Sequence, residues 1–404
     1  MPVPEAGRAE RAAWLRLVLT PGIGPAKARQ LLASFGLPEE VFEANPQALA
    51  RVVGERAAHA LHAPTPQLTR QLEQSLEWAQ APDHHLLCLT DPEYPPQLLE
   101  ITDPPPLLFV RGNPALLSRP ALAIVGSRSA SRSGLDTARA FARTLAQAGL
   151  TISSGLAAGI DASAHAGALG TAASTVGILG NGVDAPYPAS NRGLAEQIVS
   201  EGGALISEFA LGSEPRASNF PRRNRLIAGL SLGVLVVEAA LRSGSLITAR
   251  QAADFGREVF AIPGSIHATL AKGCHHLIKQ GAKLVESAQD ILSELPGHQA
   301  IAIAQRPAPS LAGRIDRCDE TSIAMEGLNR LIDRRGLGST PAVVDDEPLL
   351  QVLGWDPLTA DALGARLAQD GKEPTNLAAQ LLTLEMQGLV EQLADGRFQR
   401  RALT

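Results

Sequence analysis

Short apolar runs alternate with longer amphipathic segments in the middle of the chain, and glycine-rich turns separate the two. The runs cover residues 121–126, 151–154, 174–179, 204–207, 233–238, 258–262 and 283–285. Segments of helical length, such as 134–148 and 189–200, lie between them. Strands that are apolar along their whole length and alternate with helices are typical of a parallel sheet buried on both faces. The pattern therefore predicts a doubly wound α/β domain with a mostly parallel sheet.

The region before this domain follows a different pattern. Residues 14–79 place apolar side chains at spacings of three and four, which predicts helices. A proline-rich passage at 91–111 comes next, and the apolar runs 86–89 and 107–110 beside it are candidate strands. The start of the chain is therefore expected to be helical, with a short connection of two strands into the sheet.

The end of the chain predicts a linker, then three short helices and a hairpin. The helices are expected at 349–353, 359–368 and 376–387, and Asp395-Gly396 is a typical hairpin turn. That order favours a winged-helix-like domain. We therefore divide the chain into an N-terminal helical domain (8–80), the α/β domain (81–295), a linker (296–345) and the winged-helix-like domain (346–404).

The length and net charge of the chain limit where a nucleic acid could bind. With 404 residues the chain exceeds one ordinary domain, so two or three folding units are expected. Its formal net charge of −5 argues against a chain that binds nucleic acid over its whole surface. Any nucleic-acid site must therefore be a local basic patch.

The cysteines and the distribution of apolar residues indicate the compartment. Cys88, Cys274 and Cys318 are far apart, which predicts no disulfide framework and a reducing environment. Residues 1–7 lack the features of a signal peptide, and no segment approaches the roughly 20 apolar residues needed to cross a bilayer. We expect a soluble, cytoplasmic protein with no membrane partner.

Candidate site residues lie in the turns that follow the strands, because ligands of open parallel sheets bind beyond the carboxyl ends of the strands. The first such turn is Gly126-Ser127-Arg128. Glycine lets the backbone approach a ligand closely, and arginine offers a planar fork suited to phosphate. No Gly-Lys-Ser/Thr sequence follows, so a P-loop NTPase is not expected. The alternative is a tight turn with a solvated arginine.

The turn after the fourth strand is the most informative. It places Phe220, Arg222, Arg223, Asn224 and Arg225 at a helix entrance, with Arg216 just upstream. Single-stranded nucleic acid needs such a combination, because cations follow the phosphates while an aromatic face stacks on a base. Arginines at a helix N-terminus oppose the helix dipole, which favours a binding role over a solvated basic helix start.

The turn after the fifth strand has two interpretations. Ser243, Gly244 and Ser245 lead into a helix, where they either hold a phosphate or only cap that helix. Both alternatives stay open at this point.

Two other groups of polar residues suggest chemistry less strongly. Asp161 and His165 share a helix face, either as an acid–base pair or, the favoured alternative, as a structural pair. Cys274-His275-His276 lacks the second cluster that a four-ligand metal site needs. We expect no catalytic residue, no metal and no cofactor.

Taken together, these stretches resemble the DNA-processing protein DprA family, also called Smf. The match runs in order through Gly126-Ser127-Arg128, residues 154–161 (SGLAAGID), Tyr187-Pro188, Ser207-Glu208, residues 220–225 (FPRRNR), residues 243–248 (SGSLIT), Pro263-Gly264, Gly273, Leu277-Ile278 and Gly281-Ala282. Each motif alone is weak, but the ordered set is highly specific.

The resemblance implies an extended Rossmann-type fold that binds and protects single-stranded DNA, forms a homodimer and helps to load RecA during natural transformation. It implies no known catalytic activity. In the family, the arginine of the Gly-Ser-Arg turn, here Arg128, and the phenylalanine of the Phe-Pro-x-Arg-Asn-Arg stretch, here Phe220, contact DNA. Some relatives carry a lysine where this chain has Ala217, and whether Arg216 replaces it is open.

The flanking domains fit the same family. Residues 20–28 (TPGIGPAKA) resemble a helix-hairpin-helix, although the N-terminal domain of the family is better described as sterile-alpha-motif-like. The predicted recognition helix of the winged-helix-like domain, 376–387, contains no Lys or Arg and carries Glu385. Because a helix that contacts phosphates should be basic, we expect this domain to contact protein or to add little DNA affinity.

Two other functions compete with DNA binding. The fold and turns also resemble Rossmann-type nucleoside-monophosphate phosphoribohydrolases, for which Glu238 and Asp161 would be candidate acids. Those enzymes carry a Pro-Gly-Gly-x-Gly-Thr turn, whereas this chain has Arg242-Ser243-Gly244-Ser245 in the comparable place. The second competitor is an adaptor whose basic stretch docks an acidic partner protein.

Overall fold

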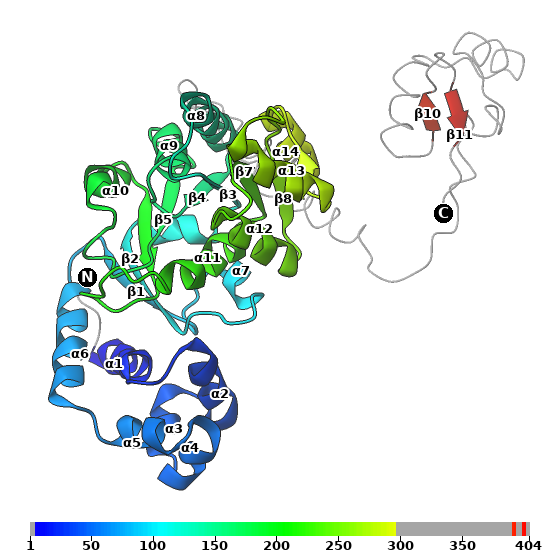
Figure 1. Cartoon of the computed structure of the whole chain (residues 1–404). Helices are drawn as coiled ribbons and strands as arrows, with labels where there is room; N and C mark the ends of the chain where they lie inside the picture. The colour runs from blue at the N-terminus through cyan, green and yellow to red at the C-terminus, as the bar shows by residue number, and fades with distance from the viewer. Residues whose placement is uncertain (1–4, 296–389, 393–397, 401–404) are drawn as a thin grey trace, which may run out of the picture. The chain divides into compact units, whose positions relative to one another are not determined.

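The computed structural model describes residues 5–295, 390–392 and 398–400 (Figure 1). Its first part is helical, as the apolar spacing predicts. The helices are α1 (Glu5–Leu19), α2 (Pro25–Phe35), α3 (Pro38–Glu43), α4 (Pro46–Val53), α5 (Glu55–His62) and α6 (Pro66–Trp78). Proline occupies the first position of α2, α3, α4 and α6, where its missing N–H costs nothing and its fixed φ favours the helix. Proline thus marks the N-terminus of four of the six helices in this region.

One mostly parallel sheet forms the core of the α/β domain. Its strands are β1 (His84–Cys88), β2 (Leu107–Gly112), β3 (Ala121–Gly126), β4 (Thr151–Ser154), β5 (Thr175–Ile178), β6 (Ala204–Ser207), β7 (Gly233–Val237), β8 (Glu258–Ala261) and β9 (Lys283–Leu284). The order is β1-β2-β6-β5-β4-β3-β7-β8-β9. From β6 to β9 all neighbours are parallel, which confirms the doubly wound α/β fold.

The two candidate strands beside the proline-rich passage are also confirmed. They form β1 and β2, which pair with each other in antiparallel fashion and join the sheet through an antiparallel pair between β2 and β6. In the parallel part, the winding runs outward from β3 to β6 in one direction and from β7 to β9 in the other. The strand order therefore reverses between β3 and β7, and this switch point is where such folds bind ligands.

Helices cover both faces of the sheet (Figure 1). After β1 they are α7 (Pro96–Leu99), α8 (Arg132–Gln147), α9 (Ile160–Ala168), α10 (Arg192–Ser200), α11 (Asn219–Gly229), α12 (Ser245–Asp254), α13 (Lys272–Lys279) and α14 (Ala288–Glu294). Alternate residues of β3 face opposite cores: Leu122 and Ile124 pack with α8, α9 and α14, whereas Ala123 and Val125 pack with α11, α12 and α13. Burial on both faces explains the uninterrupted apolar runs.

Four predicted strands extend one or two residues beyond β5, β7, β8 and β9, and two of the extra end residues leave the extended conformation. Ser174 and Glu238 have φ of 52° and 55°, in the left-handed region. Side chains other than glycine rarely adopt this conformation, and it ends the strand at that point. The hydrophobicity of a residue carries no information about its φ angle, so the apolar pattern does not show where these strands stop.

A second compact unit, Leu311–Thr404, is separate from the first, Met1–Ser310. In it the structure describes the antiparallel pair β10 (Val390–Gln392) and β11 (Phe398–Arg400), which matches the predicted hairpin. The predicted helices, the turn Asp395-Gly396 and the linker 296–345 lie outside the described residues. The boundaries at 80, 295 and 345 stay predictions. Within the described part of the chain, no helix has the length and apolar character required to span a membrane.

Candidate nucleic-acid interface

A cavity of about 780 Å³ opens at the carboxyl ends of β3 and β7, at the switch point of the sheet. Its walls come from the loops after β3, β4, β5 and β7 and from the start of α11. Nine predicted site residues line it: Gly126, Ser127, Arg128, Phe220, Arg223, Asn224, Ser243, Gly244 and Ser245. The fold thus brings three turns, which are up to about 120 residues apart in the sequence, to one place.

Arg128 and two aromatic rings form one wall of the cavity. The Cζ atom of Arg128 lies 5.5 Å from the ring centroid of Phe220, within range of a cation–π contact. The ring of Tyr187 lies 6.0 Å from that of Phe220, centroid to centroid, and Tyr187 is 46% exposed. Tyr187 belongs to one of the motifs of the family resemblance, but it was not predicted as a site residue. Since only 3% of the chain is aromatic, an aromatic side chain in a loop at this edge was the available signal.

Close packing fixes the turn that presents Arg128. A Cβ atom at Gly126 would lie 1.9 Å from the carbonyl oxygen of Val237 and 2.7 Å from the Ile160 side chain, so only glycine fits. The amide of Ile160 donates to the carbonyl of Ser127 over 3.1 Å. The turn is therefore tied to both β7 and the start of α9, and this fixes the backbone from which Arg128 projects.

The predicted turn at Ser243 leads directly into α12. The hydroxyl oxygens of Ser243 and Ser245 lie 2.7 Å apart, and the amide of Ser245 donates weakly to the Ser243 hydroxyl over 3.4 Å. Gly244 is the N-cap residue, and no side-chain hydrogen bond caps the helix there. Because helix N-termini attract anions, this start of α12 at the cavity wall is compatible with a phosphate contact.

Arg223 lies beneath the cavity and holds its floor together. Arg223 is 4% exposed, and its guanidinium donates to the carbonyls of Gly155, at 2.6 Å, and of Ile178. The carboxylate of Asp161 accepts from the amides of Gly155 and Ala157 at 3.1 and 3.4 Å. Burial lowers the pKa of Arg223 to about 10 and raises the pKa of Asp161. Arg223 thus ties α11 to the ends of β4 and β5.

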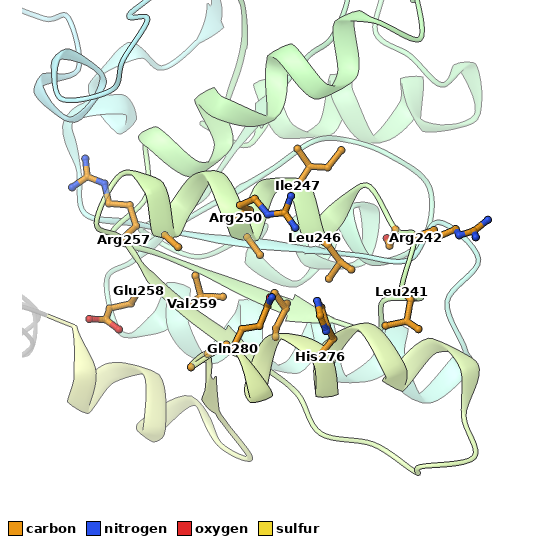
Figure 2. A pocket seen from close by; sticks show the side chains of 16 residues that line it. Leu241, Arg242, Leu246, Ile247, Arg250, Arg257, Glu258, Val259, His276 and Gln280 are labelled. Atoms are coloured by element: carbon orange, nitrogen blue, oxygen red, sulfur yellow. The ribbon is translucent and has the colours of Figure 1, made fainter.

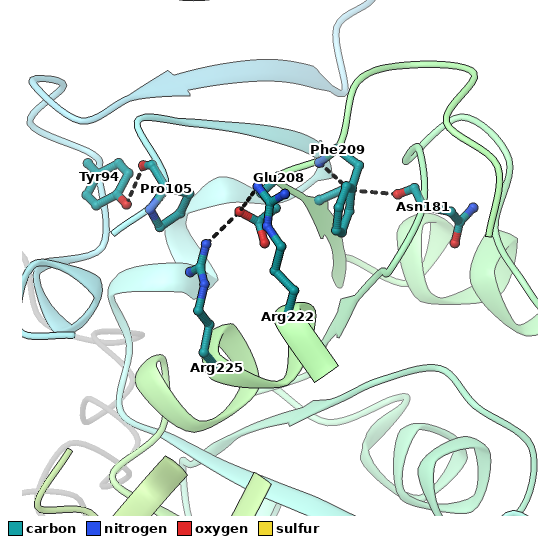
Figure 3. A network of polar contacts seen from close by, with 8 residues as sticks. Tyr94, Pro105, Asn181, Glu208, Phe209, Arg222 and Arg225 are labelled. Atoms are coloured by element: carbon teal, nitrogen blue, oxygen red, sulfur yellow. Dashed lines mark hydrogen bonds and ion pairs between the residues drawn. The ribbon is translucent and has the colours of Figure 1, made fainter. Parts of the chain in front are cut away.

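The other two arginines of the stretch turn to an acid outside the cavity. Figure 3 shows Arg222 and Arg225 reaching Glu208, at 3.0 and 2.6 Å. The side chains of Glu208 and Arg225 are 2% and 11% exposed, so this pair is buried. The structure does not bring Arg222 or Arg225 to the cavity. Arg216 is exposed and stands between two residues that line the cavity, Pro215 and Ala217, without lining it itself. A DNA contact by these three side chains stays a prediction.

A partner for these arginines could have been suspected from spacing. Arg222 and Arg225 are three apart on one helix, so they share a face and can meet the same group. Glu208 directly follows the fourth predicted strand, at the same edge of the sheet as α11 begins. Glu208 and Arg225 are far enough apart in the sequence that no short-range pattern predicts their ion pair.

Both candidate acids of an enzyme are engaged in structural contacts. Glu238 accepts from the amide of Ser131 at 2.8 Å and from the Ser131 hydroxyl, and that hydroxyl accepts from the amide of Gly134 at the start of α8. Asp161 is held by the amides named above and by the nearby Arg223. These contacts favour structural roles for both carboxylates.

Asp161 and His165 do not form an acid–base pair. The Nδ1 atom of His165 lies 2.7 Å from the hydroxyl of Thr175, which in turn donates to the carbonyl of Ile152. The ring therefore donates from Nδ1 and stays inside the core. His275 contacts the carbonyl of Gly264 at 3.0 Å, and no group of metal-ligating side chains forms among the residues that the structure describes.

The buried histidine predicts loss of stability in acid. Burial lowers the pKa of His165 to about 3, whereas an unfolded histidine titrates near 6.5. Between these values the unfolded chain binds one proton more, so stability is lost as pH falls from about 6.5 toward 3, by about 1.4 kcal/mol per pH unit at most. Urea unfolding at several pH values should show a flatter dependence for His165→Asn than for the natural chain. If the free energy of unfolding depends on pH in the same way in both proteins, His165 is not the group responsible.

Family models match all three parts of the chain. Residues 85–296 match the model described as DNA recombination-mediator protein A. The chain belongs to this family. Residues 8–67 match a DprA-like N-terminal HHH domain, and residues 339–396 match the DprA winged helix domain. The family, the helical N-terminal domain and the winged-helix domain predicted from the sequence are thereby confirmed. For the N-terminal domain, the matching model carries the helix-hairpin-helix description and not the sterile-alpha-motif-like one.

Individual relatives agree with the family models. Protein Smf of Escherichia coli is 52% identical over 56% of this chain, and the chain covers 60% of its length, less than two thirds. Protein Smf of Synechocystis is 36% identical over 97% of this chain and 99% of the relative. The crystal structure of DNA processing protein A from Streptococcus pneumoniae covers 70% of this chain and 96% of its own, with a TM-score of 0.58 and 36% identity.

Proposed function

We propose that this chain binds single-stranded DNA in the cavity at the switch point and acts there without catalysis. The observation that carries the proposal is the wall formed by Arg128, Phe220 and Tyr187. A cation beside aromatic faces suits a flexible strand, because the cation holds a phosphate and each ring stacks on a base. A base inside a duplex is already stacked and does not offer its face. The proposal therefore includes a preference for single strands.

The finer parts of the proposal concern partners. We infer from the family resemblance that the chain protects the strand and loads a RecA recombinase during natural transformation. The match to DNA recombination-mediator protein A supports a role in recombination. We further propose that the chain acts as a homodimer in the cytoplasm. Multi-angle light scattering of the full chain, and RecA filament assembly on strands coated by a single-strand-binding protein, test these two parts.

The test of the function is a fluorescence anisotropy titration of the full chain. Labelled oligonucleotides of one sequence, single-stranded and duplex, are titrated over a series of salt concentrations. We expect tight binding to the single strand that weakens with salt and depends little on sequence. Equal affinity for the duplex would contradict the proposal. Release of free base from a nucleoside monophosphate would instead support the enzyme alternative.

Removing the charge of Arg128 should lower the salt dependence of binding. Each phosphate contact on a single strand contributes about 0.7 to the slope of log affinity against log salt. We therefore expect Arg128→Ala to reduce that slope by about 0.7. Arg139→Ala, an exposed position on α8 that does not line the cavity, is the matched control and should leave the slope unchanged. Equal changes in both variants would show a general charge effect.

A further inference from the structure

Glu238 follows β7 in an unusual backbone conformation. Its φ of 55° lies in the left-handed region, which side chains other than glycine rarely adopt. The residue comes directly after Val237, the last residue of β7 that pairs with β3 at the switch point. Left-handed residues of this kind persist where surrounding contacts hold them, and they cluster at functional sites. The contacts of the Glu238 side chain therefore indicate its role.

The Glu238 carboxylate binds the far end of the loop that carries Arg128. One of its oxygens accepts from the amide of Ser131 at 2.8 Å, and the other accepts from the Ser131 hydroxyl. That hydroxyl in turn accepts from the amide of Gly134, at 3.0 Å, in the first turn of α8. Glu238 and Ser131 are 107 residues apart in the sequence, so this contact ties two separate loops together.

Consecutive residues at the end of β7 anchor both ends of this loop. At the first end, Gly126 packs so closely on the carbonyl oxygen of Val237 that a Cβ atom would lie 1.9 Å from it. At the second end, Ser131 is bound by Glu238. Arg128 lies between the two anchors. The backbone from which it projects is therefore held on both sides.

The sequence at the start of α8 leaves room for the carboxylate. A Cβ atom at Gly134 would lie 2.5 Å from the Cδ atom of Glu238 and 2.6 and 2.8 Å from its two carboxylate oxygens. A larger residue there would displace the carboxylate. The N-terminus of a helix favours a negative charge, and in many folds a bound phosphate supplies it. Here the chain's own carboxylate lies at this position.

The loop that begins at Glu238 forms another wall of the cavity. Arg242 and Ser243 of this loop line the cavity, whereas Glu238 and Ser131 do not. Figure 2 shows the point where the loop enters α12, with Arg242 labelled. One side chain outside the cavity thus joins the loop that carries Arg128 to the loop that leads into α12.

We propose that Glu238 is a positioning residue for single-strand binding. It holds Ser131, and through it the loop, so that Arg128 meets a phosphate while the adjoining base lies on Phe220. The carboxylate also fills the anion position at the start of α8, so the phosphate meets Arg128 instead. This inference rests on the proposed function and extends it to a residue that does not contact DNA.

The sign of the effect separates positioning from charge. A carboxylate near the cavity repels phosphates, so the loss of its charge alone would strengthen DNA binding. The loss of a positioning residue should weaken binding, because Arg128 is no longer held at the phosphate. Glu214, which is exposed and next to Pro215 of the cavity wall, is the matched charge control. Glu214→Asn should bind the single strand at least as tightly as the natural chain does.

The test is a double-mutant cycle of Glu238 and Arg128 in the full chain. Fluorescence anisotropy measures binding of a labelled single-stranded oligonucleotide over a salt series. Glu238→Asn removes the contact with Ser131, and asparagine tolerates the left-handed backbone. We expect this variant to bind roughly two- to tenfold more weakly, as for the loss of one hydrogen bond, with a salt slope closer to that of Arg128→Ala. In the Arg128→Ala background it should have little further effect.

Two further variants test the same link with smaller changes. Ser131→Ala removes only the hydroxyl that joins Glu238 to α8, and it should weaken binding in the same direction. Glu238→Gln keeps the length of the side chain and one oxygen that can accept from the Ser131 amide, so it should retain more affinity than Glu238→Asn. Thermal unfolding shows whether each variant is folded. If Glu238→Asn is not, Ser131→Ala takes its place in the cycle.

Four results would overturn the proposal. The first is unchanged or tighter binding by the folded variant that lacks the contact. The second is an equal loss with and without Arg128, since Glu238 would then act independently of that arginine. The third is an equally large loss in Glu214→Asn, which would show a general effect of removing an acid. In the fourth, the natural chain does not bind the single strand, and the proposed function fails together with this inference.

Discussion

Replacing Phe220 with alanine should weaken single-strand binding by about 1–3 kcal/mol, or roughly 5- to 150-fold, without changing the salt slope. The ring lines the cavity next to Arg128 and Tyr187, so a base can stack on it while the cation holds the adjoining phosphate. Stacking involves no counterion release, which is why only the affinity should move. Anisotropy titrations of the variant over a salt series measure both quantities at once.

Two conservative variants separate stacking from simple loss of volume. Phe220→Leu keeps an apolar side chain of similar size but has no aromatic face, so it should resemble the alanine variant. Phe220→Tyr keeps the face and should bind nearly as the natural chain does. If leucine restores full affinity, the ring only fills space and the stacking role is wrong. Thermal unfolding of each variant checks that the fold is intact.

Glu208→Gln should lower the free energy of unfolding by about 3–5 kcal/mol, since it leaves Arg225 buried without its counter-charge. The Arg225 guanidinium lies 2.6 Å from the Glu208 carboxylate, and both side chains are nearly inaccessible to water (Figure 3). Chemical unfolding in urea measures the loss. At a salt concentration where the variant stays folded, its affinity for single-stranded DNA should be close to that of the natural chain.

Arg222→Ala is the matched control for this prediction. Arg222 contacts the same carboxylate at 3.0 Å, but its side chain is 41% exposed, and exposed ion pairs contribute only about 0–1 kcal/mol. A large loss of stability from Arg222→Ala, or a small one from Glu208→Gln, would contradict the assignment of Glu208 to Arg225. Direct loss of DNA binding in folded Glu208→Gln would assign the pair to the DNA site.

The sheet could be predicted from the sequence because both of its faces are buried. Residues 121–126 are apolar at every position, and alternate side chains enter two different cores. Hydrophobicity reports burial, so it locates such strands well. It does not report backbone conformation, and this is why the predicted strand 174–179 began one residue too early, at Ser174, and the predicted strand 233–238 ended one residue too late, at Glu238.

The sequence predicted which turns form the candidate site, but not which side chains in those turns face the cavity. The rule that ligands bind at the carboxyl ends of parallel strands placed Arg128, Phe220 and Ser243 at one edge, and the structure brings them to one cavity. Composition could not tell which arginine of residues 222–225 faces that cavity. The buried positions of Arg223 and Arg225 depend on Ile178 and Glu208, contacts that only the folded chain creates.

The central claim is that the cavity at the switch point holds the single strand. Photochemical crosslinking of the full chain to an oligonucleotide that carries 4-thiothymine, followed by mass spectrometry of the crosslinked peptides, locates the strand directly. We predict crosslinks on Phe220, Tyr187 or the other residues that line the cavity, and their loss in Arg128→Ala at high salt. Crosslinks confined to residues 8–67 or 339–396, with none around the cavity, would contradict the account.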